Sequence, residues 1–159
     1  MSVAFTREED LEATAADLAD RPISPHANLV TPEGLALIEA ELAQARAAYT
    51  AAQVAGSIES DRTAMARATR DLRYWASRRA SAQLQEPTPG DGSVRFGATV
   101  TIERADGRAQ TWRIVGEDEA DPREGRISYV SPLAQALLGR SVGDEGTAAG
   151  QTFEIVAVG

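Results

Sequence analysis

Apolar side chains are spaced in two different ways along the chain, and the change of spacing divides it into a helical part and a β part. In the helical part they recur at alternating steps of three and four residues, which places them along one face of a helix. A first seam of this kind consists of Leu35, Ile38, Leu42, Ala45, Tyr49 and Ala52. A second seam consists of Met65, Ala68, Leu72, Trp75, Arg79 and Ala82. A polar turn at Gly56 and Ser57 separates them, so the pattern predicts an antiparallel pair of helices.

The ends of these helices also have sequence signals. Thr31 is a suitable N-cap and Pro32 suits the first helical position, so the first helix is expected to begin there. The second is expected to run from Asp61 to Leu84. At about 1.5 Å per residue, about 24 residues per helix give an arm of roughly 36 Å. Because both seams are rich in alanine, the helices bury little apolar area, and the arm is expected to be the less stable part of the molecule.

Beyond the helices, the sequence has the alternation and the turn residues of a small β domain. Strands are expected at Val94–Arg104, Gln110–Gly116, Arg126–Val130 and Gln151–Val158, with a hairpin turn at Asp106 and Gly107 and a helix from Ser131 to Gly139. The predicted fold class is α+β, in which an antiparallel helical hairpin, a coiled coil, precedes an antiparallel β domain with one helix. The predicted domains are a flexible acidic extension at 1–29, the arm at 30–85, a linker at 86–93 and the C-terminal domain at 94–159.

Composition excludes several classes of protein. The chain of 159 residues has no cysteine, which excludes a disulfide framework, a thiolate metal site and a cysteine nucleophile. A net charge of −8 argues against a protein that holds duplex DNA by neutralising its phosphates. Neither a membrane span nor a signal peptide is visible, so a soluble cytoplasmic protein is expected. The one histidine, His26, is interpreted as a solvated loop residue.

Five motifs in the C-terminal part occur in a fixed order. They are Val94–Val100, Arg113–Asp121, Ile127-Ser128, Ser131–Arg140 and Val142–Glu145. Together they closely resemble the C-terminal domain of the GreA and GreB elongation factors, which has an FKBP-like fold, and Val30–Leu35 resembles the start of the Gre arm. The resemblance implies that the C-terminal domain docks on the rim of the secondary channel of bacterial RNA polymerase and that the arm enters this channel. A monomer is expected, with no cofactor of its own.

The tip of the arm departs from the Gre pattern. In Gre factors, two acidic residues there help to hold a catalytic Mg²⁺ that cleaves backtracked RNA, in a site that the polymerase completes. An ungapped match places Ser57 and Ser60 at these positions, and the helices are about one heptad short, which withdraws the tip by roughly 10 Å. Catalytic groups tolerate misplacement on the order of 1 Å. We therefore expect a regulator that is not an enzyme; the alternative is an active cleavage factor with Glu59 and Asp61 as the tip acids.

Each candidate site has a second, structural interpretation. Glu59 and Asp61 either form a shifted tip that shares Mg²⁺ with the polymerase, or decorate a solvated turn and cap the second helix, which we favour. The basic patch consists of Arg62, Arg67, Arg70 and Arg73. It either guides the nascent RNA 3′ end along the channel or is a solvated face that pairs with Asp71 and with Glu39 or Glu41.

The acidic loop Glu117–Asp121 admits three interpretations. A calcium site is weakly indicated because the acids lack the spaced pattern of calcium loops, and the second interpretation is a loop that only adds solubility. We favour the third, a polymerase-docking edge. Its predicted residues are Asp118, Glu119, Asp121, Ser131 and Pro132. A prolyl isomerase, the function that an FKBP-like fold also suggests, is disfavoured because the sequence shows no set of aromatic pocket residues.

Overall fold

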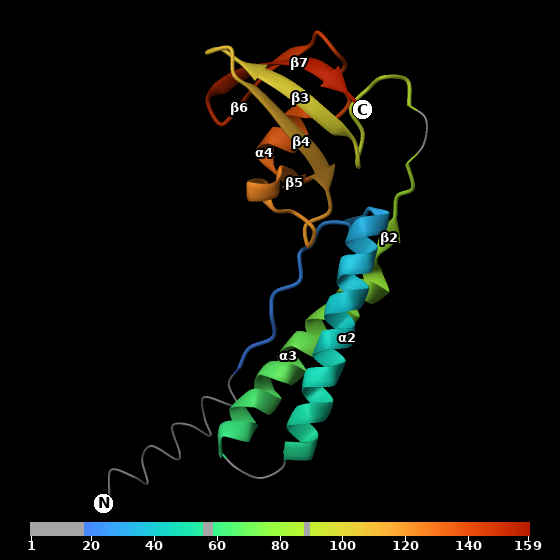
Figure 1. Ribbon diagram of the computed structural model, residues 1–159, viewed down its shortest axis with the longest axis vertical. Helices are drawn as coiled ribbons and strands as arrows, with labels where there is room; N and C mark the ends of the chain where they lie inside the picture. Colours follow the sequence, from blue (N-terminus) through green and yellow to red (C-terminus); the bar gives the residue numbers. More distant parts are fainter. Residues whose placement is uncertain (1–17, 56–58, 88–89) are drawn as a thin grey trace, which may run out of the picture. The chain divides into compact units, whose positions relative to one another are not determined.

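The computed structural model describes residues 18–55, 59–87 and 90–159, in which the chain forms two compact units (Figure 1). The first unit contains the described residues of Met1–Pro25 together with Ile38–Ser81, and the second contains His26–Leu37 and Ala82–Gly159. The first unit is helical, and the second is built on a β-sheet. The predicted α+β class is therefore confirmed. Among the residues described, no helix is long and apolar enough to cross a bilayer.

Two long helices form the arm. They are α2 (Pro32–Ala55) and α3 (Glu59–Ser81). The Arg79 Nε lies 3.1 Å from Glu39 Oε1, which joins the end of α3 to the beginning of α2 and shows that the helices run antiparallel. The helix α3 begins at Glu59, so Asp61 lies inside its first turn instead of capping it.

The seam of the arm follows the predicted spacing except at one end. Its buried residues include Ile38, Leu42 and Ala45 of α2 and Ala68 of α3, whereas Met65, Leu72 and Trp75 are half-buried. The predicted seam residue Arg79 is exposed, and its neighbour Arg78 is buried, with 2 % of its surface accessible. The last step along α3 after Trp75 is therefore three residues, not four. Because steps of three and four both fit a helical stripe, apolar spacing alone cannot choose between two adjacent arginines.

A short parallel strand pair closes the end of the helical segment. The strand β1 (Leu29–Val30) pairs with β2 (Gln83–Leu84), so α3 ends at Ser81 and not at Leu84 as predicted. Two-residue strands contain no alternation that a sequence pattern could detect. Both strands belong to the second unit. The chain before the arm and the chain after it are thus hydrogen-bonded to each other.

The β domain is a five-stranded sheet in the order β5-β4-β3-β7-β6. Its strands are β3 (Thr99–Arg104), β4 (Ala109–Val115), β5 (Arg126–Ser128), β6 (Glu145–Ala148) and β7 (Gln151–Val158). All neighbours are antiparallel except β4 and β5, so the sheet is mixed rather than fully antiparallel as predicted. The predicted strands correspond to β3, β4, β5 and β7. The strand β6 was not predicted because it contains no large apolar residue.

One face of the sheet carries the core, and the helix α4 (Pro132–Leu137) contributes to it. The core residues are Val94, Val100, Ile102, Ile114, Ile127, Ala134, Leu137, Phe153 and Ile155. Alternate residues of β3 and β7 point into this core, which leaves the intervening side chains on the outer face. Val94–Ala98, predicted as the beginning of the first strand, lies before β3, and Gly97 there has a positive φ of 85°.

Candidate functional site

The N-terminal end of α2 is fastened to the β domain by a buried pair of polar side chains. The Thr31 hydroxyl donates to Glu119 Oε1 at 2.5 Å and accepts from the Gly34 amide at 2.9 Å. Thr31 and Glu119 are 1 % and 7 % exposed. A Cβ on Gly34 would lie 2.7 Å from Glu119 Oε1, so the close approach of this carboxylate requires glycine. Glu119, which we predicted on the docking edge, is instead buried, because its carboxylate accepts the hydrogen bond of the Thr31 hydroxyl at the start of α2.

Three further contacts hold the same segment, His26–Leu37, which we call the arm root. The Arg113 Nη2 lies 3.2 Å from Glu33 Oε2, and the Tyr129 hydroxyl donates to the Ala27 carbonyl. Hydrogen bonding to its own backbone amide and to Arg113 lowers the pKa of Glu33. Gly116 is packed so closely that a Cβ there would lie 2.2 Å from the Leu29 carbonyl oxygen. The first turn of the arm is thereby an integral part of the C-terminal domain.

Of the remaining predicted docking residues, Asp118 lies in a turn, and Asp121, Ser131 and Pro132 lie at the starts of two short helical segments that precede and follow β5 in the sequence. Asp121 caps the 3-10 helix η1 (Pro122–Glu124) by accepting from the Arg123 amide at 3.2 Å. Ser131 caps α4 by accepting from the Ala134 amide at 3.3 Å, and Pro132 is the exposed first residue of that helix. The Asp121 side chain is 45 % exposed, so its carboxylate can still accept from a partner. Asp118 is half-buried and also has an interaction of its own.

The acidic loop shows no metal-type geometry. Among the residues that the structure describes, no three or more histidine, aspartate or glutamate side chains are arranged to hold a metal ion. Asp121 instead lies 3.9 Å from the Arg126 guanidinium, and the Arg126 Nε donates to the Glu119 carbonyl. Asp121 thus uses its charge on a cap and an ion pair, and Glu119 uses its carboxylate on Thr31, so neither is arranged as a calcium ligand.

The basic patch on α3 is partly neutralised by neighbouring acids. The Arg70 Nε lies 3.4 Å from Asp71 Oδ1, and the Arg73 Nη1 lies 3.3 Å from Asp20 Oδ1. Arg62 and Arg67 are exposed. Asp71 was predicted as a partner of the arginines, but Asp20 was not, because 53 residues separate it from Arg73 in the sequence. A surface that pairs in part with its own acids and leaves two arginines exposed is compatible with both interpretations of the patch.

The tip of the arm lies largely outside the described residues. Gly56, Ser57 and Ile58 are not described, and of Glu59 and Asp61 only their place in the first turn of α3 is known. The choice between a shifted metal-binding tip and a solvated turn therefore stays a prediction from the sequence.

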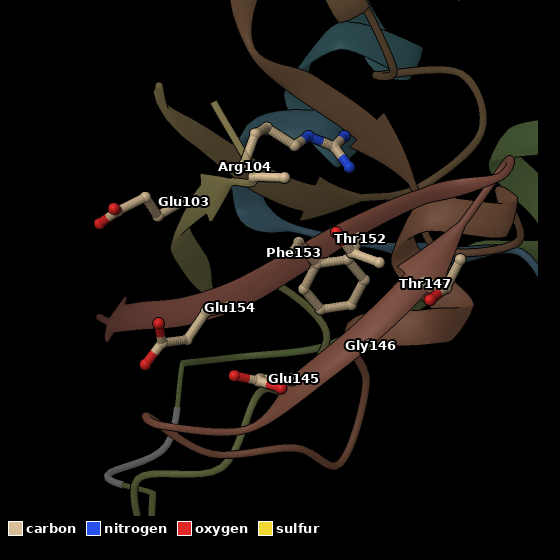
Figure 2. Close-up of a pocket in the computed structure, with 9 residues that line it drawn as sticks. Glu103, Arg104, Glu145, Gly146, Thr147, Thr152, Phe153 and Glu154 are labelled. Carbon is tan, nitrogen blue, oxygen red and sulfur yellow. The ribbon is translucent and has the colours of Figure 1, made fainter. Parts of the chain in front are cut away.

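The outer face of the sheet carries a row of three glutamates that sequence reasoning missed. Glu103 on β3 is paired in register with Glu154 on β7, and Glu154 is paired with Glu145 on β6. They line a hollow of about 490 Å³, in which Figure 2 shows them on successive strands, with the Arg104 side chain pointing away. Directly opposed like charges destabilise a sheet, and only the strand register brings these residues together. The row gives this face of the domain a negative surface.

The beginning of the strand β6 depends on a glycine. Gly146 is the register partner of Phe153, and a Cβ at Gly146 would lie 2.6 Å from the Phe153 ring. The buried ring of Phe153 thus lies against the backbone of β6, next to the glutamate row. The row is therefore positioned by the core beneath it.

Comparison with known proteins identifies the family. Residues 88–159 match the model of the GreA/GreB transcription elongation factor C-terminal domain. The chain is 39 % identical over 134 residues to the transcription elongation factor GreA of Desulfovibrio desulfuricans, covering 78 % of this chain and 82 % of that protein. It is 36 % identical over 152 residues to GreA of Psychrobacter sp. strain PRwf-1, and this match covers 81 % of this chain and 95 % of that protein. The chain belongs to the GreA/GreB family. The resemblance inferred from the five motifs is thereby confirmed.

Other relatives of the GreA/GreB family match over a shorter range or at lower identity. GreA of Hyphomonas neptunium is 49 % identical over 74 residues, so this match spans 43 % of the chain and about half, 47 %, of that relative. Among solved structures, the GreA factor homolog 1 (Gfh1) of Thermus thermophilus is 21 % identical, with a TM-score of 0.40 and coverage of 84 % of this chain and 99 % of that chain. The GreA/GreB factor of Nitrosomonas europaea is 19 % identical, with a TM-score of 0.40 and coverage of 82 % of this chain and 97 % of that chain. These structural similarities are too low to transfer detail.

Proposed function

We propose that this GreA/GreB family member is a cytoplasmic regulator that binds bacterial RNA polymerase as a monomer through its C-terminal domain. Its arm enters the secondary channel and modulates elongation without efficient RNA cleavage. The observation that supports this most is the combination of a match over 95 % of a GreA protein with neutral Ser57 and Ser60 at the family's acidic tip positions. Neutral hydroxyls cannot supply the charge that draws a second Mg²⁺ to an active centre.

The C-terminal domain is suited to a basic protein partner. Its candidate docking edge consists of Asp118, Asp121, Ser131 and Pro132, after removal of the buried Glu119. The glutamate row adds negative charge elsewhere on the same domain. Complementary charges steer association and fix the orientation of a complex. In the arm, the exposed Arg62 and Arg67 are the residues of the basic patch that we expect to meet the nascent RNA 3′ end or the channel wall.

The arm root has defined contacts within the second unit. Here the Thr31–Glu119 pair and the Glu33–Arg113 pair fix the first turn of α2 within the second unit. The Thr31–Glu119 pair is buried, so breaking it would leave an unsatisfied polar group, whereas the Glu33–Arg113 pair is partly exposed to solvent. We therefore expect the root to retain its structure on binding.

The docking edge can be tested by charge reversal. Asp118→Arg combined with Asp121→Arg is expected to weaken binding to the cognate polymerase by about 1–3 kcal/mol, roughly 5- to 150-fold in Kd, because these carboxylates would face basic groups. The measurement is a titration of labelled protein with core polymerase. Since Asp121 also caps η1, Asp121→Asn serves as a control that keeps an acceptor for the Arg123 amide.

A second control separates a local effect from one of total charge. Glu86→Arg combined with Asp106→Arg makes the same total charge change at two exposed residues of the second unit that lie outside the docking edge and the glutamate row. Equal losses of affinity in the Glu86/Asp106 variant and in the Asp118/Asp121 variant would mean that only the net charge matters. Unchanged affinity of the Asp118/Asp121 variant would remove the docking assignment.

The alternative function is an active transcript-cleavage factor. It is favoured by one observation, the presence of Glu59 and Asp61 within the first turn of α3, on either side of Ser60, which occupies one of the family's two acidic positions. In that case the two carboxylates would share a Mg²⁺ with the polymerase, and the factor would still hold no metal alone.

A further inference from the structure

A segment before the arm is held against α3 by two ion pairs. Asp20 Oδ1 lies 3.3 Å from the Arg73 Nη1, and the Arg21 Nη1 lies 3.6 Å from Asp71 Oδ1. The two pairs have opposite polarity. In one the acid is Asp20 of the segment, and in the other the acid is Asp71 of α3, two positions before Arg73. All four residues belong to the first unit. Residues 18–25, predicted as part of a flexible extension, therefore have defined partners on the arm.

Aromatic side chains of α3 contribute a third contact. The Arg21 guanidinium carbon lies 3.9 Å from the centroid of the Tyr74 ring and 5.4 Å from that of Trp75. The two rings meet edge to face with their centroids 4.9 Å apart. A guanidinium over an aromatic face is attracted by the ring quadrupole. The single side chain of Arg21 thus engages both an acid and an aromatic pair on the same face of α3.

The attachment is strong enough to order the segment but is exposed to solvent. Ile23, the large apolar residue of the segment after Leu18, is 47 % exposed, and Pro22 and Pro25 are exposed as well. The side chains in the two ion pairs are between 37 % and 67 % exposed. Exposed ion pairs are individually weak and are screened by salt. An attachment made of such contacts opens more easily than the packed seam beneath it.

We propose that residues 18–25 form a detachable strap that covers the arginine–aromatic face of α3 and lowers the affinity of the arm for polymerase until it opens. This inference rests on the proposed function. The strap places the Asp20 carboxylate beside Arg73 and the Arg21 guanidinium over the Tyr74 ring. It therefore covers both a cationic and an aromatic side chain through which this face could contact a partner. A partner that needs the face free binds with an apparent affinity reduced by the fraction of molecules in which the strap is open.

The position of the strap can be measured without polymerase. The chain has no cysteine, so Ile23→Cys supplies a single exposed thiol for a bimane label in the full-length protein. Trp75 quenches such a label when the strap is closed, because Arg21, two residues from the label, lies over its ring. A Trp75→Phe variant establishes the unquenched signal. Rising salt is expected to reduce quenching, since both ion pairs are exposed.

The decisive comparison uses Asp20→Asn combined with Arg21→Gln, which removes the ion pairs and the cation over the rings while leaving every helix residue unchanged. We expect quenching to be lost and the affinity for polymerase to rise roughly 3- to 30-fold. The matched control is Arg108→Gln, which removes an exposed ion pair with Asp106 in the β domain and should change neither signal.

The possible results separate the strap from the function it rests on. Retained quenching in the Asp20/Arg21 variant would overturn the assignment of the contacts that hold the strap. Lost quenching with unchanged or reduced affinity would overturn autoinhibition and make the segment a brace of the arm. Failure of both the wild-type protein and the variant to bind polymerase would overturn the proposed function and, with it, the regulatory role of the strap.

Discussion

Replacing Ile38 by alanine is expected to lower the free energy of unfolding of the arm by about 2–5 kcal/mol. Ile38 is completely buried, at 0 % exposure, in a seam whose other buried residues include the small Ala45 and Ala68. Alanine neighbours have no long side chains with which to fill the space that the larger residue leaves, so the cost falls near the cavity-forming limit. The measurement is urea unfolding followed by circular dichroism at a helical wavelength.

Leu72→Ala is the matched control for this prediction. Leu72 belongs to the same seam but is half-buried, so its removal takes less apolar surface out of the interior and is expected to cost less than the Ile38 change. Equal destabilisation by the two substitutions would mean that burial in the seam does not determine the stability of the arm. No destabilisation by Ile38→Ala would contradict the packing of the hairpin.

Gly116→Ala is expected to destabilise the second unit by about 1–3 kcal/mol, because the added methyl group has no space. It would lie 2.2 Å from the Leu29 carbonyl oxygen, a backbone atom that cannot rotate away as a side chain can. Either β4 or the arm root has to move, and β1 with its two partners in β2 moves with it. Denaturant unfolding with a probe in the β domain measures the loss.

The control for the glycine prediction is Gly90→Ala. There the nearest atom to an added Cβ is at 3.7 Å, an ordinary contact, and the change is expected to stay within about 0.5 kcal/mol of the wild type. If Gly116→Ala were as well tolerated as Gly90→Ala, the close packing of the arm root against the β domain would be refuted.

The regular elements could be predicted because local chemistry determines them. The steps of three and four around Ile38 and Leu42 require a helix to bury them together, and Asp106-Gly107 provides the turn between β3 and β4. Ser131 and Pro132 specify the start of α4 by a cap and a fixed φ. In each case a few adjacent residues contain the whole signal.

The functional details depended on contacts between distant residues and could not be predicted in the same way. The pairing of Thr31 with Glu119 spans 88 positions, and nothing in the acidic loop distinguishes the one carboxylate that becomes buried. The glutamate row exists only through the registers of β3, β6 and β7. The contacts of Asp20 and Arg21 with α3 depend on how an extended segment crosses a helix, for which the sequence has no periodic signal.

The glutamate row and the arm root differ in their exposure to solvent. The row is a solvent-facing surface whose like charges oppose folding slightly, whereas the root contains the buried residues Asn28, Val30 and Thr31 and contributes to stability. Substitutions in the row are therefore expected to affect association more than folding. Substitutions in the root should first affect folding, and they are unsuitable as probes of binding unless stability is measured in parallel.

The central claim, that the arm enters the polymerase channel without supplying cleavage chemistry, is tested most directly by RNA cleavage in backtracked complexes of the cognate polymerase. We expect little or no stimulation of cleavage by this protein, and competition that slows a genuine cleavage factor added to the same complexes. Robust Mg²⁺-dependent cleavage that disappears when Glu59 and Asp61 are both replaced by alanine would contradict this expectation and show that the acids of the tip have only shifted along the chain.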